Sequence, residues 1–465
     1  MWAFDLTQYD DVWKVVINIG LLLTALILGN MLRRVIPFLK KAFIPSALIG
    51  GVIIFAVNLI AKAIFGEEIV DRRIMQVVTY HALAVGFIAM SLKIVEKKKD
   101  GHKLHVVQNG LLTGGTYMLQ AVVGILVSLI FFWIGGKLFY DTGVLLPLGF
   151  GQGPGNALTW DNIFTDAGYL TSEGSLGLTI ASVGFVVASV IGVIYINIFK
   201  RKGEIVHKEK NFIRSVTDFE QNNEIEDSES VDKISIQFAF VAVSYLFSFL
   251  IMLFFKKLTD WTNVKLFNDV AWGFNFIWGV ITATLIKEFM KFLKKKKVVK
   301  QKYINNYQMD RISGFAFDLM IIAGVAAIDL NVVKDYIWVI VALCAAGTVV
   351  TTVYVNIMAK LCFKGFRHEA FLVNFGTLTG TASNGMILLR EIDPNYETPT
   401  SNIFILSQFP AMLAVAPLLL LLNMSAKSYS GCLIALGIFG ALFVVYTTFL
   451  IISSRKAAKK VEDKK

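Results

Sequence analysis

Charged residues are scarce in this sequence: Asp, Glu, Lys and Arg make up 17% of its 465 residues, against roughly a quarter in an average soluble domain. This scarcity, the 37 Phe and a mean hydropathy of +0.63 exclude a soluble enzyme, a disordered chain and a coiled coil. Apolar runs of about twenty residues, the length that crosses a bilayer, recur from one end of the chain to the other. The sequence therefore predicts an all-α polytopic membrane protein.

Cysteines and catalytic motifs are also sparse. Cys344, Cys362 and Cys432 have no metal-ligand spacing, so they indicate small buried side chains and no disulfide framework. The chain contains no Ser/His/Asp arrangement, no H-E-x-x-H motif and no phosphate-binding loop. We therefore expect neither an enzyme nor an ATP-driven pump, and no cofactor. Because the start of the chain lacks a basic region and a small-residue cleavage site, we expect the first apolar run to be retained.

The basic residues indicate how the chain crosses the membrane. The formal net charge is +11, but Lys and Arg lie in short connections between apolar runs and form no patch for nucleic acid. With eleven crossings and an outside N-terminus, the cytoplasmic side holds 34 Lys and Arg and the outer connections hold nine. This asymmetry satisfies the positive-inside rule and places the C-terminus in the cytoplasm. We predict crossings at 12–32, 42–64, 74–95, 108–135, 175–199, 234–255, 270–291, 312–332, 336–361, 401–423 and 430–453.

Two further apolar segments, 143–164 and 371–390, are too rich in Gly, Pro, Asn, Ser and Thr for one continuous helix each. If either segment crossed the membrane once, every later connection would change side and the charge asymmetry would collapse. We therefore predict that both are re-entrant hairpins, each entering and leaving at one face.

An internal repeat with an offset of 225 residues relates the two halves of the chain. Gly151-Gln-Gly-Pro-Gly155-Asn-Ala aligns with Gly376-Thr-Leu-Thr-Gly380-Thr-Ala, and most crossings align at the same offset. Each half has five crossings, an odd number, so the halves take opposite senses in the membrane, as in secondary transporters. The predicted units are an inverted repeat over 1–199, a cytoplasmic linker over 200–233, a second inverted repeat over 234–425, and an eleventh helix with a basic tail over 430–465.

The two broken segments form the candidate site, because irregular backbone at membrane depth is tolerated only inside protein or beside water. Helix starts after the bends would offer N–H groups to an anion, while freed carbonyls and hydroxyls suit Na⁺. The alternative is that the glycines serve only close helix packing. The candidate residues are Gly151, Gln152, Gly153, Pro154, Gly155, Asn156, Gly376, Thr377, Thr379, Gly380, Thr381, Ser383 and Asn384. We place Na⁺ near Thr379, Thr381, Asn384 and Asp318.

Ionisable residues in or beside the apolar segments extend this set. Asp318 is either a cation ligand or gate contact, or a structural hydrogen-bond partner. Arg390 is a candidate for bidentate pairing with a substrate carboxylate, but a local pair with Asp393 or an interfacial anchor is the favoured interpretation. For His81 we favour a structural hydrogen bond, and for Lys294–Lys297 a patch that contacts lipid headgroups.

The segments Gly149-Phe-Gly-Gln-Gly-Pro-Gly155, Thr379-Gly-Thr381 and Leu388-Leu-Arg-Glu-Ile-Asp-Pro394, with the two-half plan, resemble the sodium/glutamate symporter family. The resemblance covers nearly the whole chain in layout, and these short motifs in residues. It implies Na⁺-coupled uptake of an acidic amino acid through the cytoplasmic membrane of a bacterium. It also implies a homodimer in which a transport domain moves against a scaffold.

The sequence hypothesis is an alternating-access symporter that carries a small carboxylate, most simply glutamate, together with Na⁺. An ion-coupled carrier of a dicarboxylate or hydroxycarboxylate stays open as an alternative. A passive channel with re-entrant loops is disfavoured because the chain lacks an Asn-Pro-Ala signature and is far longer than such pores. A sensor or a membrane enzyme is disfavoured because no soluble catalytic or signalling domain is present in the sequence.

Overall fold

The computed structural model describes residues 13–94, 103–135, 138–204, 233–262, 271–272, 275–298, 303–393 and 398–462, without the side chains of 233, 383 and 458–462. Most of the predicted linker over 200–233 therefore lies outside the described residues, as does the side chain of Ser383. Every regular element in the described ranges is a helix. The prediction of an all-α protein is confirmed for this part of the chain.

Nine helices of the described residues are long and apolar enough to cross a membrane. These are α1 (Lys14–Val35), α3 (Ser46–Phe65), α4 (Arg72–Leu92), α5 (Lys103–Gly135), α8 (Ser175–Arg201), α10 (Lys233–Thr262), α15 (Ile337–Cys362), α19 (Gln408–Lys427) and α20 (Tyr429–Glu462). The short elements between them are α2 (Pro37–Lys41), the 3₁₀ turn η2 (Thr142–Val144), α14 (Leu330–Asp335) and α18 (Thr400–Leu406). The chain is a multi-pass membrane protein.

Two of the eleven predicted crossings are helices that fall outside this set of nine. They are α12 (Asn275–Lys295) and α13 (Asn306–Ala326), with 21 residues each. Both carry several ionic residues, such as Lys287 in α12 and Asp318 in α13, which lower their apolar character. Their crossing of the membrane therefore stays a prediction.

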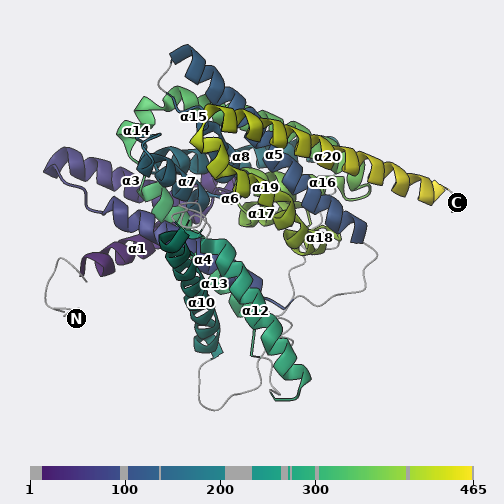
Figure 1. The fold of residues 1–465 in the computed structure, drawn as a ribbon, viewed down its shortest axis with the longest axis horizontal. Helices are drawn as coiled ribbons and strands as arrows, with labels where there is room; N and C mark the ends of the chain where they lie inside the picture. Colours follow the sequence, from purple (N-terminus) through teal and green to yellow (C-terminus); the bar gives the residue numbers. More distant parts are fainter. Residues whose placement is uncertain are drawn as a thin grey trace.

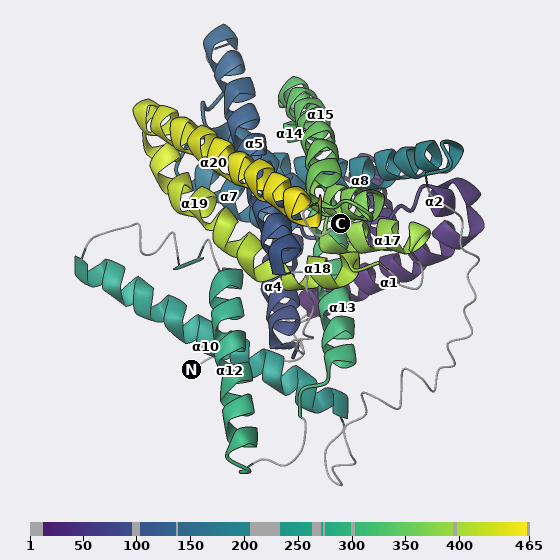
Figure 2. The ribbon, with the colours of Figure 1, turned by 90° about the vertical axis from the view of Figure 1, so that its right-hand side faces the viewer.

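The helices pack as two groups, and each group contains helices from both halves of the chain. The first group contains α1, α3, α4, α10, α12 and α13. The second group contains α5, α8, α15, α19, α20 and four shorter helices. In Figure 1 the first group lies to the left and below, and the second above and to the right. Figure 2 shows α10 and α12 projecting away from the rest of the first group.

The four shorter helices form the two broken segments. The first segment is α6 (Leu145–Gln152) followed by α7 (Pro154–Asp166), and the second is α16 (Arg367–Thr379) followed by α17 (Ala382–Ile392). At about 1.5 Å per residue these helices are roughly 12 to 20 Å long, whereas the hydrocarbon core is about 30 Å thick. None of the four is long enough to cross a membrane alone.

Local sequence explains where several helices begin. Asp71 precedes α4, and its carboxylate accepts from the N–H groups of Arg73 and Ile74. Asn305 caps α13 in the same way, through the N–H groups of Tyr307 and Gln308. These side chains satisfy N–H groups that have no partner in the first turn of a helix.

Candidate functional site

The first helix break lies at Gly153, between α6 and α7. Gly153 has φ +82° and ψ −173°, a conformation that is essentially restricted to glycine. Pro154 follows as the first residue of α7, where its missing N–H leaves no helical hydrogen bond unmade. Helix α6 therefore ends at Gln152 and α7 begins at Pro154, with Gly153 as the single residue between them.

The second break lies at Gly380 and Thr381, between α16 and α17. Gly380 has φ −140° and ψ −103°, and Thr381 is extended. The two helices then pack against each other: a methyl group on Gly376 would lie 2.8 Å from the Cα of Gly385. Because only glycine allows this approach, α16 and α17 form a closely packed pair.

The two breaks meet in space. A methyl group on Gly153 would lie 3.6 Å from the Cγ2 of Thr381 and 3.6 Å from the Cε of Met320 on α13. A methyl group on Gly324, one turn further along α13, would lie 2.9 Å from the Cβ of Pro154. The structure thus brings together the predicted residues on both segments, with α13 of the first group packed against them.

An asparagine lies three residues after each bend and bonds back to it. The Asn156 amide donates to the Gln152 side chain, and the Asn384 carbonyl oxygen accepts from the Thr381 hydroxyl at 3.1 Å. Asn156 is 1% exposed and Asn384 is 5% exposed. Within the described residues, the Asn156 Oδ1 and the Asn384 Nδ2 have no hydrogen-bond partner. The two bends therefore leave one buried acceptor and one buried donor unpaired within the described residues.

The carboxyl ends of α6 and α16 lie side by side on α8. A methyl group on Gly184 of α8 would overlap the Thr379 carbonyl oxygen and would lie 3.1 Å from the Phe150 ring. The last carbonyls of a helix have no partner within it and carry partial negative charge, which favours a cation. The starts of α7 and α17 offer free N–H groups and partial positive charge, which favours a carboxylate.

The place where the two breaks meet is called the junction here. A narrow crevice beside Asn384, lined by Phe43, Ala188, Ser189, Ile387 and Leu388, is too small to hold a water molecule. Ligand entry would require the surrounding helices to move. This enclosure fits a site that binds its ligand away from bulk water.

The other predicted hydroxyls mostly bond within their own helix. The Thr377 hydroxyl donates to the Val373 carbonyl at 2.7 Å, and the Thr379 hydroxyl to the Phe375 carbonyl at 2.7 Å. Their remaining lone pairs can still accept from a ligand or bind a cation. The Ser383 side chain lies outside the described residues. Gly151, Gly155 and Gly376 each lie so close to neighbouring atoms that a methyl group there would come within 3 Å of them.

The ionisable candidates lie on three different helices, α13, α17 and α4. Asp318 is half-buried on α13, two residues before Met320, and its carboxylate has no hydrogen bond or ion pair with the described residues. Arg390 is exposed near the end of α17, six residues beyond Asn384. His81 bonds to the Tyr245 hydroxyl at 2.6 Å, which fits a structural role. The predicted role of each charged residue at the site stays open to experiment.

Several residues at the junction were not predicted from the sequence. The additions are Leu83 on α4, Tyr117 and Gln120 on α5, Gly184 on α8, and Met320 and Gly324 on α13. The sequence contained one indication of the role of Gln120. Helix α5 carries Gln, Asn and Thr within a strongly apolar segment, and polar side chains in such helices often contact other helices. The remaining residues are glycines and apolar side chains, whose role depends on contacts across the fold.

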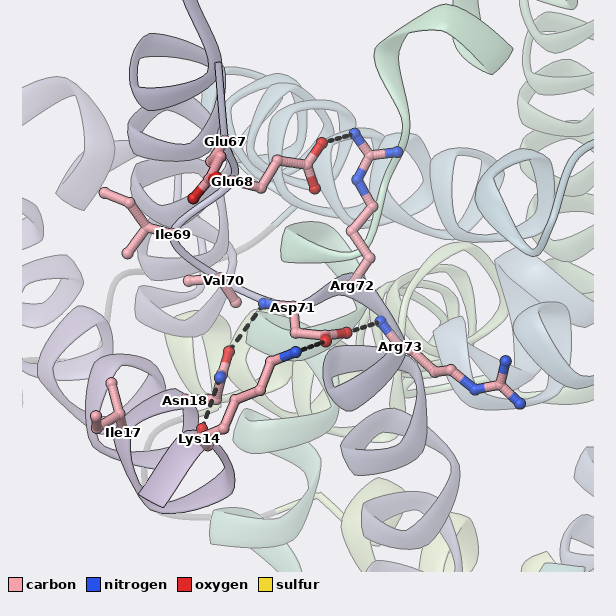
Figure 3. Close-up of a pocket in the computed structure, with 10 residues that line it drawn as sticks. All are labelled: Lys14, Ile17, Asn18, Glu67, Glu68, Ile69, Val70, Asp71, Arg72 and Arg73. Atoms are coloured by element: carbon pink, nitrogen blue, oxygen red, sulfur yellow. Dashed lines mark hydrogen bonds and ion pairs between the residues drawn. The ribbon is translucent and has the colours of Figure 1, made fainter. Parts of the chain in front are cut away.

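A larger pocket of about 590 Å³ lies at the start of α4, away from the breaks (Figure 3). Four of its charged side chains form ion pairs: Lys14 with Asp71 at 2.7 Å, and Arg72 with Glu68 and with Asp329, the residue before α14. The Lys14 partner holds the pKa of the Asp71 carboxyl below its usual range. In Figure 3 the Arg73 side chain points away from these pairs. This pocket is an ion-pair network that joins α1, α4 and α14.

The described residues contain no group of three or more His, Cys, Asp or Glu side chains able to hold a metal ion. The oxygens at the breaks are instead amide, hydroxyl and backbone carbonyl groups. Such neutral oxygens suit a hard monovalent cation carried as a substrate.

Comparison with known families gives one match. The model of the family described as sodium/glutamate symporter matches residues 13–378. The matched range includes the whole first break and ends one residue before Thr379. No protein with a curated description matches the chain.

Proposed function

Because the chain belongs to the sodium/glutamate symporter family, we propose that it imports glutamate together with Na⁺ by alternating access. The proposed setting is the cytoplasmic membrane of a bacterium, with the N-terminus outside, the C-terminus in the cytoplasm, and two copies per transporter. The proposed site is the junction of the two breaks, built from Gly151–Asn156 and Gly376–Asn384.

The observation that carries this proposal is one unpaired polar atom on each of two buried amides at the bends, the Asn156 Oδ1 and the Asn384 Nδ2. A buried polar atom without a hydrogen bond costs about 1–3 kcal/mol, and a bound ligand is one way to supply the missing partner. The Asn384 Nδ2 is able to donate to a carboxylate, and the Asn156 Oδ1 is able to accept from an ammonium group or bind a cation. An amino acid with its coupling ion supplies both partners.

Electrostatics at the helix ends support the pairing of Na⁺ with an anion. The carbonyl ends of α6 and α16 meet on α8 at Gly184, where partial negative charge favours the cation. The starts of α7 and α17 supply free N–H groups for carboxylate oxygens. Since each charge offsets the other, the two ligands cross the membrane at lower cost together than apart.

Ion pairs at one end of α8 support a hairpin for the second segment. Lys200 of α8 pairs with Glu391 at the end of α17 at 3.5 Å. Glu204, just after α8, forms an ion pair with Arg367 at 3.3 Å, and its carboxylate lies 3.3 Å from the Nε2 of His368. Both partners are at the start of α16. Both ends of the segment are thus tied to the same end of α8, as a re-entrant hairpin requires.

Cysteine labelling tests this topology. With the three native cysteines replaced, single cysteines at Lys364 and Thr398 flank the second segment. Both should react with an impermeant maleimide only from the cytoplasmic side. Labelling of the two positions from opposite sides would contradict the hairpin.

The arrangement of the two helix groups supports inverted repeats. Corresponding helices of the two halves, such as α3 and α12 or α4 and α13, lie in the same group. The helices that frame the breaks, α5 and α15, pack against each other across the two halves. A pseudo-two-fold relation between inverted halves produces this kind of pairing.

Uptake into proteoliposomes tests the function. A panel of labelled glutamate, aspartate, dicarboxylates and hydroxycarboxylates is measured with and without an inward Na⁺ gradient. We expect concentrative glutamate uptake that requires the gradient. Preference for a dicarboxylate or hydroxycarboxylate would assign a different substrate, and flux that only equilibrates would indicate a channel.

Two variants test the site itself. Asn156→Leu and Asn384→Leu each remove one unpaired amide, and each should reduce uptake by about tenfold or more. Asn58→Leu is the matched control, because Asn58 is also buried but bonds to the Val70 backbone far from the breaks. Uptake unchanged in the first two variants would remove those residues from the site.

A further inference from the structure

Gln120 connects α5 to the second break. Its Nε2 donates to the Leu378 carbonyl oxygen at 2.9 Å and to the Thr351 hydroxyl of α15 at 2.8 Å. Gln120 and Thr351 are both fully buried. One side-chain amide therefore joins α5, α15 and the last turn of α16.

The contacted carbonyl is one of the few that α16 cannot satisfy itself. The last four carbonyls of a helix lack N–H partners from the same helix, and in α16 these include Leu378 and Thr379. A donor that fixes the Leu378 carbonyl also fixes the direction of the neighbouring Thr379 carbonyl, which lies against Gly184 of α8. The position of Gln120 thus determines where the partial negative charge of this helix end is presented.

The same helix also contacts the first break. A methyl group on Gly151 would lie 2.5 Å from the Cζ and 2.6 Å from the hydroxyl oxygen of Tyr117. Tyr117 lies three residues before Gln120, so the two side chains project from α5 about one turn apart. Adjacent turns of one continuous helix therefore support the carbonyl ends of both broken helices.

We propose that Gln120 is a positioning residue that holds the carbonyl end of α16 in the geometry that binds the coupling cation. The inference rests on the proposed function, since it assigns the cation to this helix end. Gln120 acts through the Leu378 carbonyl and needs no contact with the ligands. Its loss should weaken cation binding more than it slows the transport cycle.

The test is Gln120→Leu, which keeps the size of the side chain and removes the donor. We expect the Na⁺ concentration for half-maximal uptake to rise by about five- to tenfold, the size of one lost hydrogen bond, with the maximal rate changed by less than about twofold. A fall in maximal rate with an unchanged half-saturating Na⁺ concentration would overturn the proposal.

Gln108→Leu is the matched control. Gln108 is a second buried glutamine of α5, 1% exposed, and its Nε2 donates to the hydroxyls of Ser453 and Ser454 on α20 at 3.0 and 3.2 Å. The two variants lose similar buried hydrogen bonds, but only Gln120 contacts a broken helix. An equal change in Na⁺ dependence in both variants would show a general packing effect and overturn the proposal.

Variants of Thr351 give a graded test with a conservative rescue. Thr351→Val removes the hydroxyl that orients the Gln120 amide, and should raise the half-saturating Na⁺ concentration by about two- to threefold. Thr351→Ser keeps the hydroxyl and should restore the wild-type value. A serine variant as impaired as the valine variant would contradict this role.

Hydrogen exchange separates this inference from the proposed function. Without any ligand, Gln120→Leu should exchange faster than wild type in peptides covering 374–384, whereas Gln108→Leu should not. If Gln120→Leu exchanged faster but uptake by the wild-type protein did not depend on Na⁺, Gln120 would still support α16. The proposed coupling to Na⁺ would then be refuted. Exchange unchanged by Gln120→Leu would overturn the positioning role itself.

Discussion

Gly153 faces the Thr381 methyl group across a space that one methyl group would fill, so the two helix breaks are neighbours although 228 positions separate them in the chain. The space exists because the residue on the first segment has no side chain. This pairing leaves the amide groups of Asn156 and Asn384 beside the same junction. A change at either position should therefore act on both segments.

Gly153→Ala should abolish uptake. The alanine would have to adopt φ near +82° with ψ near −173°, a strained conformation that costs about 1–3 kcal/mol, and its methyl group would fill the space toward Thr381. Relief of this strain would change the angle between α6 and α7 and distort the proposed site, because Pro154 still prevents a continuous helix. The measurement is glutamate uptake per folded transporter, with thermal unfolding in detergent as the check on folding.

Gly168→Ala is the control for this change. Gly168 also has a positive φ, +76°, but a methyl group there would meet no atom within 4 Å. We expect a loss of stability of about 1 kcal/mol without loss of uptake. Full uptake by Gly153→Ala would show that the bend tolerates a side chain, contrary to its proposed role.

Gly184→Ala should weaken the response to Na⁺. The new methyl group would overlap the Thr379 carbonyl oxygen, a backbone atom that moves only with α16. The carbonyl ends of α6 and α16 would then separate, and we expect the half-saturating Na⁺ concentration to rise by about tenfold or more. Na⁺-dependent uptake over a concentration series measures this shift.

A second glycine of the same helix provides the comparison. The three atoms nearest to a methyl group on Gly192 would all belong to the Leu388 side chain of α17, and none is a backbone atom. Gly192→Ala should therefore change stability but leave Na⁺ dependence at the wild-type value. Equal shifts in both variants would mean that α8 packing, not the helix ends, controls the response.

The helix breaks could be predicted from the sequence because their causes are local. The glycines and prolines of 146–158 predict an interrupted helix, and the structure places the interruption at Gly153; the repeat predicts the second break at Gly380. The nine apolar helices follow from hydropathy in the same way. The resemblance to the sodium/glutamate symporters, based on these motifs, is confirmed by the family match.

The residues that support the breaks could not be predicted because they act through contacts with residues far away in the sequence. Gln120 acts on Leu378, 258 residues away, and nothing in the sequence near Gln120 identifies that partner. Gly184 is one glycine among 36, and only its place between Thr379 and Phe150 gives it a role. The inverted repeat and the residues of the site remain predictions that the proposed experiments test.

The ion pair between Arg72 and Asp329 should stabilise the protein through the link between α4 and α14. Both side chains are about one-quarter exposed, so solvent screens the pair and a coupling energy of about 1 kcal/mol is expected. A double-mutant cycle with Arg72→Gln and Asp329→Asn measures it by chemical unfolding. A coupling energy of zero would show that the pair contributes nothing.

The coupling energy between Arg72 and Asp329 should decrease at low pH. Burial alone would raise the pKa of the Asp329 carboxyl, but the Asn331 N–H and Arg72 outweigh burial and lower the pKa. A carboxyl with a lowered pKa contributes stability above its unfolded pKa of about 3.9 and loses it as the pH falls further. The coupling energy should be constant from pH 6 to 8 and decline below about pH 4.

Asp141 should have the opposite effect on stability. It lies fully buried before η2, where it accepts from the Ser425 hydroxyl at 2.6 Å, and burial raises its pKa to about 7. A carboxyl with a raised pKa stabilises the fold below its unfolded pKa of about 3.9, and this contribution is lost as the pH rises toward 7. Asp141→Asn removes the ionisation, so its stability relative to wild type should increase by about 2–3 kcal/mol between pH 5 and 8.

Thermal unfolding in detergent across this pH range measures the difference, with Asp166→Asn as the control at an exposed carboxylate of α7. Because the amide introduced by Asp141→Asn would still offer an oxygen to Ser425, the packing between α19 and this connection should survive the substitution. The control should follow the wild-type curve at every pH. If the stability of Asp141→Asn changed with pH as that of the wild type does, ionisation of the Asp141 carboxyl would not destabilise the folded state. A partner or a water molecule would then have to compensate for its burial.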